Sequence, residues 1–127
     1  MATRLWQNTA KVHFDVTSRP DGKRLIYGGH IISLARALSF NGLANAQMIV
    51  AINGGAHANP AVSGDTVRAW TEVLEKAETP APGVGALRLR LVATKGPAPQ
   101  GHALKGEDGK YLPHVLLDFD YWVLVPL

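Results

Sequence analysis

One apolar segment constrains the fold of this chain more than any other feature. It runs from Gly28 to Gly42, and its apolar residues would cover most of the circumference of a helix: Ile31, Ile32, Leu34, Ala35, Leu38 and Phe40. A helix this apolar is usually buried, and this one is too short and too interrupted to span a bilayer. Gly28-Gly29 mark its start and Asn41-Gly42 its end, because these residue types tolerate the backbone angles of helix ends. We therefore predict one central helix that the rest of the chain surrounds.

The bulk composition narrows the class of protein. A chain of 127 residues suits a single domain spanning residues 1–127, and 46% hydrophobic against 18% charged residues is typical of a folded protein. Cysteine is absent, which excludes disulfides and thiolate metal sites. The first residues lack the apolar core of a signal peptide, so we expect a cytoplasmic location. The net charge of +3 comes from scattered basic residues. This favours an anionic small ligand over nucleic acid or a membrane.

Four segments that follow the helix have strand patterns. Residues 46–53 are almost continuously apolar, which predicts a strand buried on both faces, and residues 54–60 then break the regularity. Residues 66–76, 86–94 and 115–125 alternate, with inward positions such as Leu87, Leu89 and Leu91 in the second of these segments. We therefore predict an α+β architecture in which an antiparallel sheet wraps around one helix, an arrangement called the hot-dog fold.

The connecting segments and outer strand faces extend this prediction. Residues 1–18 predict a short helical or irregular segment that covers one end of the core. Residues 96–113 predict a long loop, and loops of that length in a small domain are usually functional or mobile. The outer faces of the strands carry large apolar residues that need cover: Trp70, Leu74, Leu116, Trp122 and Leu124. We therefore expect a homodimer or a larger homo-oligomer.

Asn8 and His13, five residues apart, are the first candidates for chemistry. An imidazole titrates near neutral pH and can transfer a proton, and a nearby amide can hold a water molecule. A half-buried histidine in a covering segment is the alternative interpretation. The second candidate is Gly29, because the free N–H groups at a glycine-led helix start can stabilise an anion or an oxyanion. A glycine needed only for tight packing would have the same sequence.

The candidate substrate-binding residues are Tyr27, Gly28 and His30 at the helix start, together with His57 and Asn59. His30 could equally be a packed histidine, and His57 and Asn59 could be solvated loop residues. The histidines have no recognisable metal-ligand spacing, so we predict neither a metal site nor a separate cofactor.

Several runs of this sequence closely resemble the C-terminal half of two-domain hydratases of the MaoC-like hot-dog family. The matching runs are distributed along nearly the whole chain: residues 6–14, 26–45, 59–60, 63–66, 84–88, 92–95 and 115–121. The resemblance implies reversible addition of water to a branched short-chain enoyl-CoA such as mesaconyl-CoA, with coenzyme A as part of the substrate. In the wider family an Asp and a His five residues apart hold and activate the water, and a backbone N–H at the helix start stabilises the oxyanion. These roles fall on Asn8, His13 and Gly29.

Two departures from the family pattern leave alternatives open. Asn8 stands where most relatives have Asp, and an amide cannot act as a base. The first strand of the C-terminal half and the entire N-terminal half have no counterpart in this sequence, which favours pairing with a second copy or with a partner hot-dog subunit. The alternatives to a hydratase are a non-catalytic acyl-CoA-binding or structural module and, last, a hot-dog thioesterase. The thioesterase needs a carboxylate near the central helix, and residues 25–64 contain none.

Overall fold

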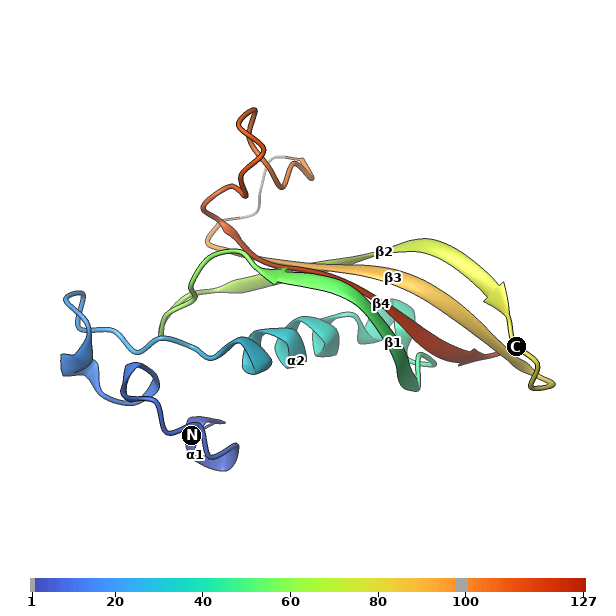
Figure 1. Ribbon diagram of the computed structural model, residues 1–127, viewed down its shortest axis with the longest axis horizontal. Helices are drawn as coiled ribbons and strands as arrows, with labels where there is room; N and C mark the ends of the chain where they lie inside the picture. Colours follow the sequence, from blue (N-terminus) through green and yellow to red (C-terminus); the bar gives the residue numbers. More distant parts are fainter. Residues whose placement is uncertain (1, 98–100) are drawn as a thin grey trace.

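A single antiparallel sheet arches over one long helix (Figure 1). The computed structural model describes residues 2–97 and 101–127. The strands lie in the order β1-β4-β3-β2, and each pairs antiparallel with its neighbours. Their bounds are Met48–His57 for β1, Val67–Glu78 for β2, Val84–Lys95 for β3 and Val115–Pro126 for β4. The predicted antiparallel sheet beside one helix is confirmed.

The central helix α2 spans Gly28–Leu38, and the short helix α3 follows at Phe40–Leu43. Its start is the predicted one, but it ends earlier than Asn41, because the Ser39 N–H turns back to the carbonyls of Arg36 and Ala37. The expectation that the helix is buried and surrounded by the rest of the chain is wrong for one of its faces in the described residues. Ile31 and Ala35 are the buried residues of α2, whereas the Leu38 and Phe40 side chains are 50% and 67% exposed. The sheet therefore covers one face of the helix and leaves the other open.

The alternating strands supply the core between sheet and helix. Leu89, Leu91 and Ala93 of β3 and Phe119, Tyr121 and Val123 of β4 point inward and pack with Ile31 and Ala35. One detail of the predicted alternation is wrong. The ladder shifts after the Ala93–Leu117 pair, because Thr94 pairs with Val115 and leaves Leu116 as the extra residue of a bulge. Leu116 thus joins the main core instead of an outer face, and Val115 belongs to a second cluster with Val92 and Leu104.

Strand β1 departs most from the prediction. It does not break after Asn53, because Gly54 and Gly55 pair with Asp120 and Phe119 of β4. A Cβ on Gly55 would lie 2.8 Å from the Phe119 Cδ2, so glycine here admits the phenylalanine ring. Nor is β1 buried on both faces: it is an edge strand, and Ile52 is 64% exposed. The helix packs chiefly beneath the other three strands.

The N-terminal segment lies beside the start of α2 (Figure 1). It contains α1 (Ala2–Leu5) and two short 3-10 turns, η1 (Lys11–His13) and η2 (Val16–Ser18). The irregular, partly helical character is as predicted, and none of residues 3–18 is itself buried. Among the described residues before α2 there is no strand, and Leu25 makes an isolated bridge with Val62.

Truncation of the inner face should destabilise the fold strongly. Leu89 is fully buried between the sheet and the helix. Leu89→Ala should lower the free energy of unfolding by about 2–5 kcal/mol, because it removes buried methyl groups and leaves a cavity. Leu74→Ala makes the same change at a side chain that is 42% exposed, where we expect less than about 1 kcal/mol. Urea unfolding of both variants measures the difference, and equal losses would contradict the assigned inner face.

Candidate active site

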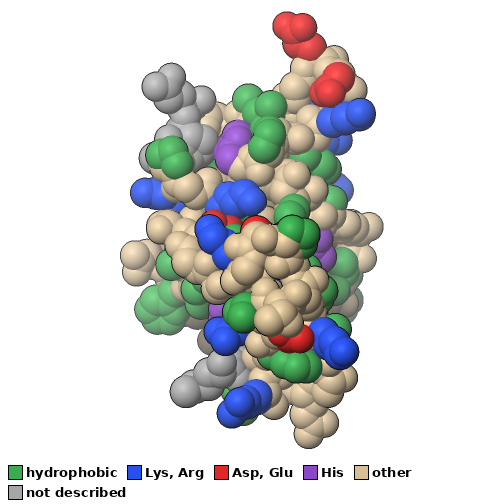
Figure 2. Space-filling model, turned by 90° about the vertical axis from the view of Figure 1, so that its left-hand side faces the viewer, with side chains coloured by type: hydrophobic (Ala, Val, Ile, Leu, Met, Phe, Trp, Pro, Cys, Tyr) green, Lys and Arg blue, Asp and Glu red, His purple; other side chains and the backbone are tan. Residues whose placement is uncertain are grey.

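A cavity of about 570 Å³ opens where the N-terminal segment, the start of α2 and the chain after β1 meet. Of the eight candidate residues, only His30 is absent from its lining. The seven that line it are Asn8, His13, Tyr27, Gly28, Gly29, His57 and Asn59. Apolar lining comes from Leu25, Ile26, Ile31, Ala61 and Leu116, with Pro60 beside them. Figure 2 faces this end of the molecule, where histidine side chains reach the surface and Lys and Arg are spread rather than gathered.

The backbone of Leu25 fixes the His13 imidazole. Its N–H donates to the Val12 carbonyl at 2.8 Å, and its carbonyl lies 2.8 Å from His13 Nδ1. Because a carbonyl oxygen can only accept, Nδ1 must carry the proton, and Nε2 of the neutral ring keeps its lone pair. The Tyr27 ring meets the imidazole edge to face, with ring centroids 6.2 Å apart. His13 is therefore oriented as a proton acceptor through Nε2.

The first turn of α2 offers backbone N–H groups to the same cavity. Within the described chain, neither the Gly28 N–H nor the Gly29 N–H has a hydrogen-bond acceptor, whereas the His30 N–H donates to the Tyr27 carbonyl. A Cβ on Gly28 would lie 2.5 Å from His57 Nε2, and one on Gly29 would lie 3.0 Å from Tyr27 Cε2. The two glycines thus let aromatic rings approach the helix start, whose free N–H groups and dipole favour negative charge.

The two asparagines of the cavity differ in how they are bonded. The Asn8 backbone N–H donates to the Thr3 carbonyl at 3.0 Å, while its side-chain amide makes no hydrogen bond within the part of the chain that the structure describes. The Asn59 Nδ2 donates to the carbonyls of Leu112 and Val115, at 2.9 and 2.8 Å. Asn59 therefore ties the loop before β4 to the cavity rim, while the Asn8 amide is free to bind a water molecule.

The lining has no carboxylate and no lysine or arginine, so its titratable side chains are two imidazoles and the Tyr27 phenol. In the described ranges 2–97 and 101–127, no group of three or more His, Asp or Glu side chains could hold a metal ion. The arrangement can hold a polar group at the helix start and move a proton at His13. None of the helices in those same ranges has the length and apolar character needed to cross a membrane.

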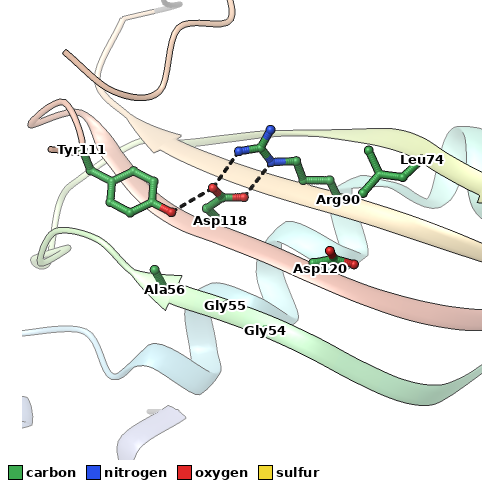
Figure 3. Close-up of a pocket in the computed structure, with 8 residues that line it drawn as sticks. All are labelled: Gly54, Gly55, Ala56, Leu74, Arg90, Tyr111, Asp118 and Asp120. Atoms are coloured by element: carbon green, nitrogen blue, oxygen red, sulfur yellow. Dashed lines mark hydrogen bonds and ion pairs between the residues drawn. The ribbon is translucent and has the colours of Figure 1, made fainter. Parts of the chain in front are cut away.

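A second cavity, of about 450 Å³, lies on the outer face of the sheet, away from α2 (Figure 3). The Arg90 guanidinium and the Tyr111 hydroxyl both point at Asp118, with bonds of 2.8 and 2.9 Å (Figure 3). Arg88 pairs with Asp120 in the same way, at 2.7 Å. These are cross-strand pairs between β3 and β4. The charges of this cavity are therefore satisfied within the sheet, which makes it a weak candidate for ligand binding.

The Asp118 pairing makes stability depend on acid pH. Its hydrogen bonds from Arg90 lower the Asp118 pKa below the ordinary value of 3.8. Because the folded-state pKa is depressed, the stabilisation is complete above that ordinary value and is lost as pH falls through the folded value. Wild-type protein should lose more unfolding free energy than Asp118→Asn between about pH 6 and about pH 2. Urea unfolding measures this. Glu107→Gln, in the exposed loop, should behave as wild type.

Sequence patterns could not reveal two features of the site. The Leu25 carbonyl orients His13, but a main-chain acceptor has no sequence signature. The Leu116 side chain enters the cavity wall because of the bulge in β4. The Arg–Asp pairs, in contrast, had a signal, since outward arginines on one strand and aspartates on the next fit an antiparallel ladder.

Two curated relatives are similar to this chain over nearly its whole length. No protein-family model matches the chain. It is 77% identical over 127 residues to mesaconyl-CoA hydratase of Cereibacter sphaeroides, covering 99% of this chain and 36% of that protein. It is 54% identical to β-methylmalyl-CoA dehydratase of Chloroflexus aurantiacus, covering 98% and 37%. The chain thus spans little more than a third of these relatives.

Solved structures give the same result for the fold. A crystal structure described as a MaoC domain protein dehydratase from Chloroflexus aurantiacus superposes with a TM-score of 0.90 at 54% identity, over 98% of this chain and 37% of that one. A monoamine oxidase regulatory protein from Archaeoglobus matches with a TM-score of 0.71 at 19% identity, over 98% and 77%, which supports the fold alone. The chain therefore has the MaoC-type hot-dog fold and is similar, over nearly its whole length, to about a third of mesaconyl-CoA hydratase.

Proposed function

We propose that this chain is a hydro-lyase that reversibly adds water to a branched short-chain enoyl-CoA such as mesaconyl-CoA. The observation that carries the proposal is the shared cavity of His13 and the first turn of α2. One side presents an imidazole whose Nδ1 is tied to the Leu25 carbonyl, and the other presents N–H groups of Gly28 and Gly29. The names of the two relatives support the same reaction in its two directions.

The reaction divides between these groups. The Gly29 N–H donates to the thioester oxygen, and the Asn8 amide holds a water molecule near His13. Nε2 of His13 takes one proton from the water while the water oxygen forms a bond to the β-carbon of the substrate. The electrons of the double bond move onto the thioester oxygen, where the Gly29 N–H stabilises the enolate. The His13 imidazolium then returns its proton to the α-carbon, so the imidazole ends neutral. Dehydration is the reverse.

The remaining lining residues would bind the acyl group. Tyr27, Gly28 and His57 border the helix start, and Ala61 and Leu116 offer apolar contact to a short branched chain. Asn59 holds the rim through its bonds to the chain before β4. His30 lies outside the lining, 6.0 Å from the Tyr27 ring centroid, and would act by packing against that ring. No separate cofactor is required by this chemistry.

The exposed apolar surface supports an assembly. Leu38 and Phe40 on the helix side, and Met48, Val50 and Ile52 on the edge strand β1, are all exposed in the chain by itself. A second copy, or a partner hot-dog subunit, would bury these side chains and extend the sheet at its edge. We therefore propose that the active form is a homodimer, a larger homo-oligomer or a complex with such a subunit, in the cytoplasm.

Incubation with mesaconyl-CoA tests the proposed activity. Loss of the enoyl-thioester absorbance, with formation of a hydrated thioester that mass spectrometry identifies, is the expected result. The assay should cover a wide range of protein concentration, because assembly depends on it. No absorbance change at high concentration, with folding confirmed by circular dichroism, would rule out catalysis by this chain alone.

A non-catalytic acyl-CoA-binding or structural module is the second candidate, and the amide of Asn8 favours it. An amide cannot accept a proton from water, so His13 must do so alone. Asn8→Asp separates the two candidates: a large gain in hydration indicates a decayed site, and a loss indicates that the amide itself positions the water. A thioesterase is not proposed, since no carboxylate lines the cavity.

A further inference from the structure

We propose that His57 is the residue that selects substrates whose acyl chain ends in a carboxylate. This inference rests on the proposed hydratase function and deepens it. The two relatives are named for mesaconyl and β-methylmalyl thioesters, and both acyl groups are dicarboxylic. Their free carboxylate lies three carbon–carbon bonds from the thioester carbon, so a site that prefers them needs a hydrogen-bond donor or a cation at that distance.

Few side-chain nitrogen donors of the cavity remain for such a group once the Asn8 amide is assigned to the water molecule. Its lining contains neither lysine nor arginine. Of the two imidazoles, His13 has its Nδ1 proton committed to the Leu25 carbonyl and its Nε2 assigned to the reacting water. The Nδ2 donors of Asn59 are committed to two backbone carbonyls. His57 makes no side-chain hydrogen bond among the described residues, so its ring N–H is available to a ligand.

The position of His57 fits the length of the acyl chain. Its imidazole lies against the backbone of Gly28, where an added Cβ would come within 2.5 Å of Nε2 and 2.6 Å of Cε1. It therefore borders the same first helical turn whose Gly29 N–H would hold the thioester oxygen. A short, extended acyl chain anchored at Gly29 would place its far end within the reach of this ring. His57 also ends β1 and is exposed, so its ring is accessible to a ligand that enters from solvent.

Two thioesters that differ only at the distal group test the proposal. Mesaconyl-CoA and tiglyl-CoA share the α-methyl group and the double-bond geometry, but tiglyl-CoA ends in a methyl group instead of a carboxylate. Wild-type protein should prefer mesaconyl-CoA in kcat/KM. His57→Leu should lower kcat/KM for mesaconyl-CoA about ten- to hundredfold, as expected for a lost hydrogen bond to a charged group. Its kcat/KM for tiglyl-CoA should stay within about threefold of wild type.

Two controls keep the result specific. His102→Leu makes the same change where the ring packs on Trp70, 5.2 Å between centroids and outside this cavity, and it should leave both substrates unaffected. His57→Gln retains a donor and should recover part of the preference. Equal losses on both thioesters, or no loss on either, would overturn the assignment of His57.

A binding measurement separates this inference from the proposed function. Succinyl-CoA and butyryl-CoA have acyl chains of equal length, and neither has a double bond to hydrate. Calorimetric titration should show tighter binding of succinyl-CoA by wild type, and His57→Leu should abolish that difference. If mesaconyl-CoA is not hydrated but the binding preference and its loss are observed, the hydratase proposal fails alone. If hydration occurs and His57→Leu leaves the binding preference intact, the His57 proposal fails alone.

Discussion

Replacing His13 with alanine should lower kcat for mesaconyl-CoA hydration by a factor of about 10²–10⁴, the range expected for loss of a positioned proton-transfer group. In the proposed mechanism a single imidazole takes a proton from water and returns it to the α-carbon. The cavity lining has no carboxylate, and its other imidazole, His57, lies against Gly28 and is assigned to the distal carboxylate of the acyl chain. Steady-state kinetics with mesaconyl-CoA measures the change.

The loss must be separated from disturbance of the N-terminal segment, because alanine also removes the bond between Nδ1 and the Leu25 carbonyl. His13→Gln can still donate an N–H toward that carbonyl but cannot carry a proton between water and carbon. It should be as inactive as His13→Ala, with an unchanged unfolding midpoint. Activity of His13→Gln within about threefold of wild type would remove His13 from the chemistry and leave it a structural role.

Replacing Gly29 with proline should lower kcat by about 10²–10³, the usual effect of removing one oxyanion donor. Proline lacks the backbone N–H, and its ring is tolerated in the first turn of a helix, where no intrahelical bond is lost. Within the described chain the Gly29 N–H has no acceptor, so the substitution removes no hydrogen bond of the folded protein. The effect should therefore fall on turnover.

Gly29→Ala is the matched control for the proline variant. Its Cβ would lie 3.0 Å from Tyr27 Cε2, as the proline Cβ would, but alanine keeps the N–H. Any cost of crowding against Tyr27 is common to both variants, and the difference in kcat between them reports the donor. If the two variants have equal kcat, the helix start does not stabilise an oxyanion and the proposed mechanism loses one of its three groups.

The local sequence determined the parts of the fold that depend on periodicity. Alternation in β3 placed Leu89 and Leu91 inward, and the structure confirms it. Gly28-Gly29 marked the start of α2, because glycine leaves the N–H groups of a first helical turn open. The same residues, with Asn8 and His13, identified the candidate site, since few residue types can move a proton or stabilise an oxyanion.

Pairing between strands decided where β1 ends and which way Leu116 faces, which the periodicity of the sequence did not predict. The run Gly54-Gly55 was predicted to end β1, yet the ladder with β4 carries the strand on to His57, and the Phe119 ring occupies the space beside Gly55. The bulge that turns Leu116 into the core depends on the register between β3 and β4. A hydrogen-bonded partner strand can override local preference, and its register is not encoded in any one segment.

The sequence alone thus determined which residues have the chemistry: the imidazole of His13, the amide of Asn8 and the glycine-led start of α2. Only the tertiary structure decided that these groups, with His57 from the end of β1, line one cavity. It also supplied the Leu25 carbonyl that sets the tautomer of His13. The physical reason is that side-chain chemistry is a property of single residues. Convergence depends on backbone hydrogen bonds and packing between segments distant in the chain.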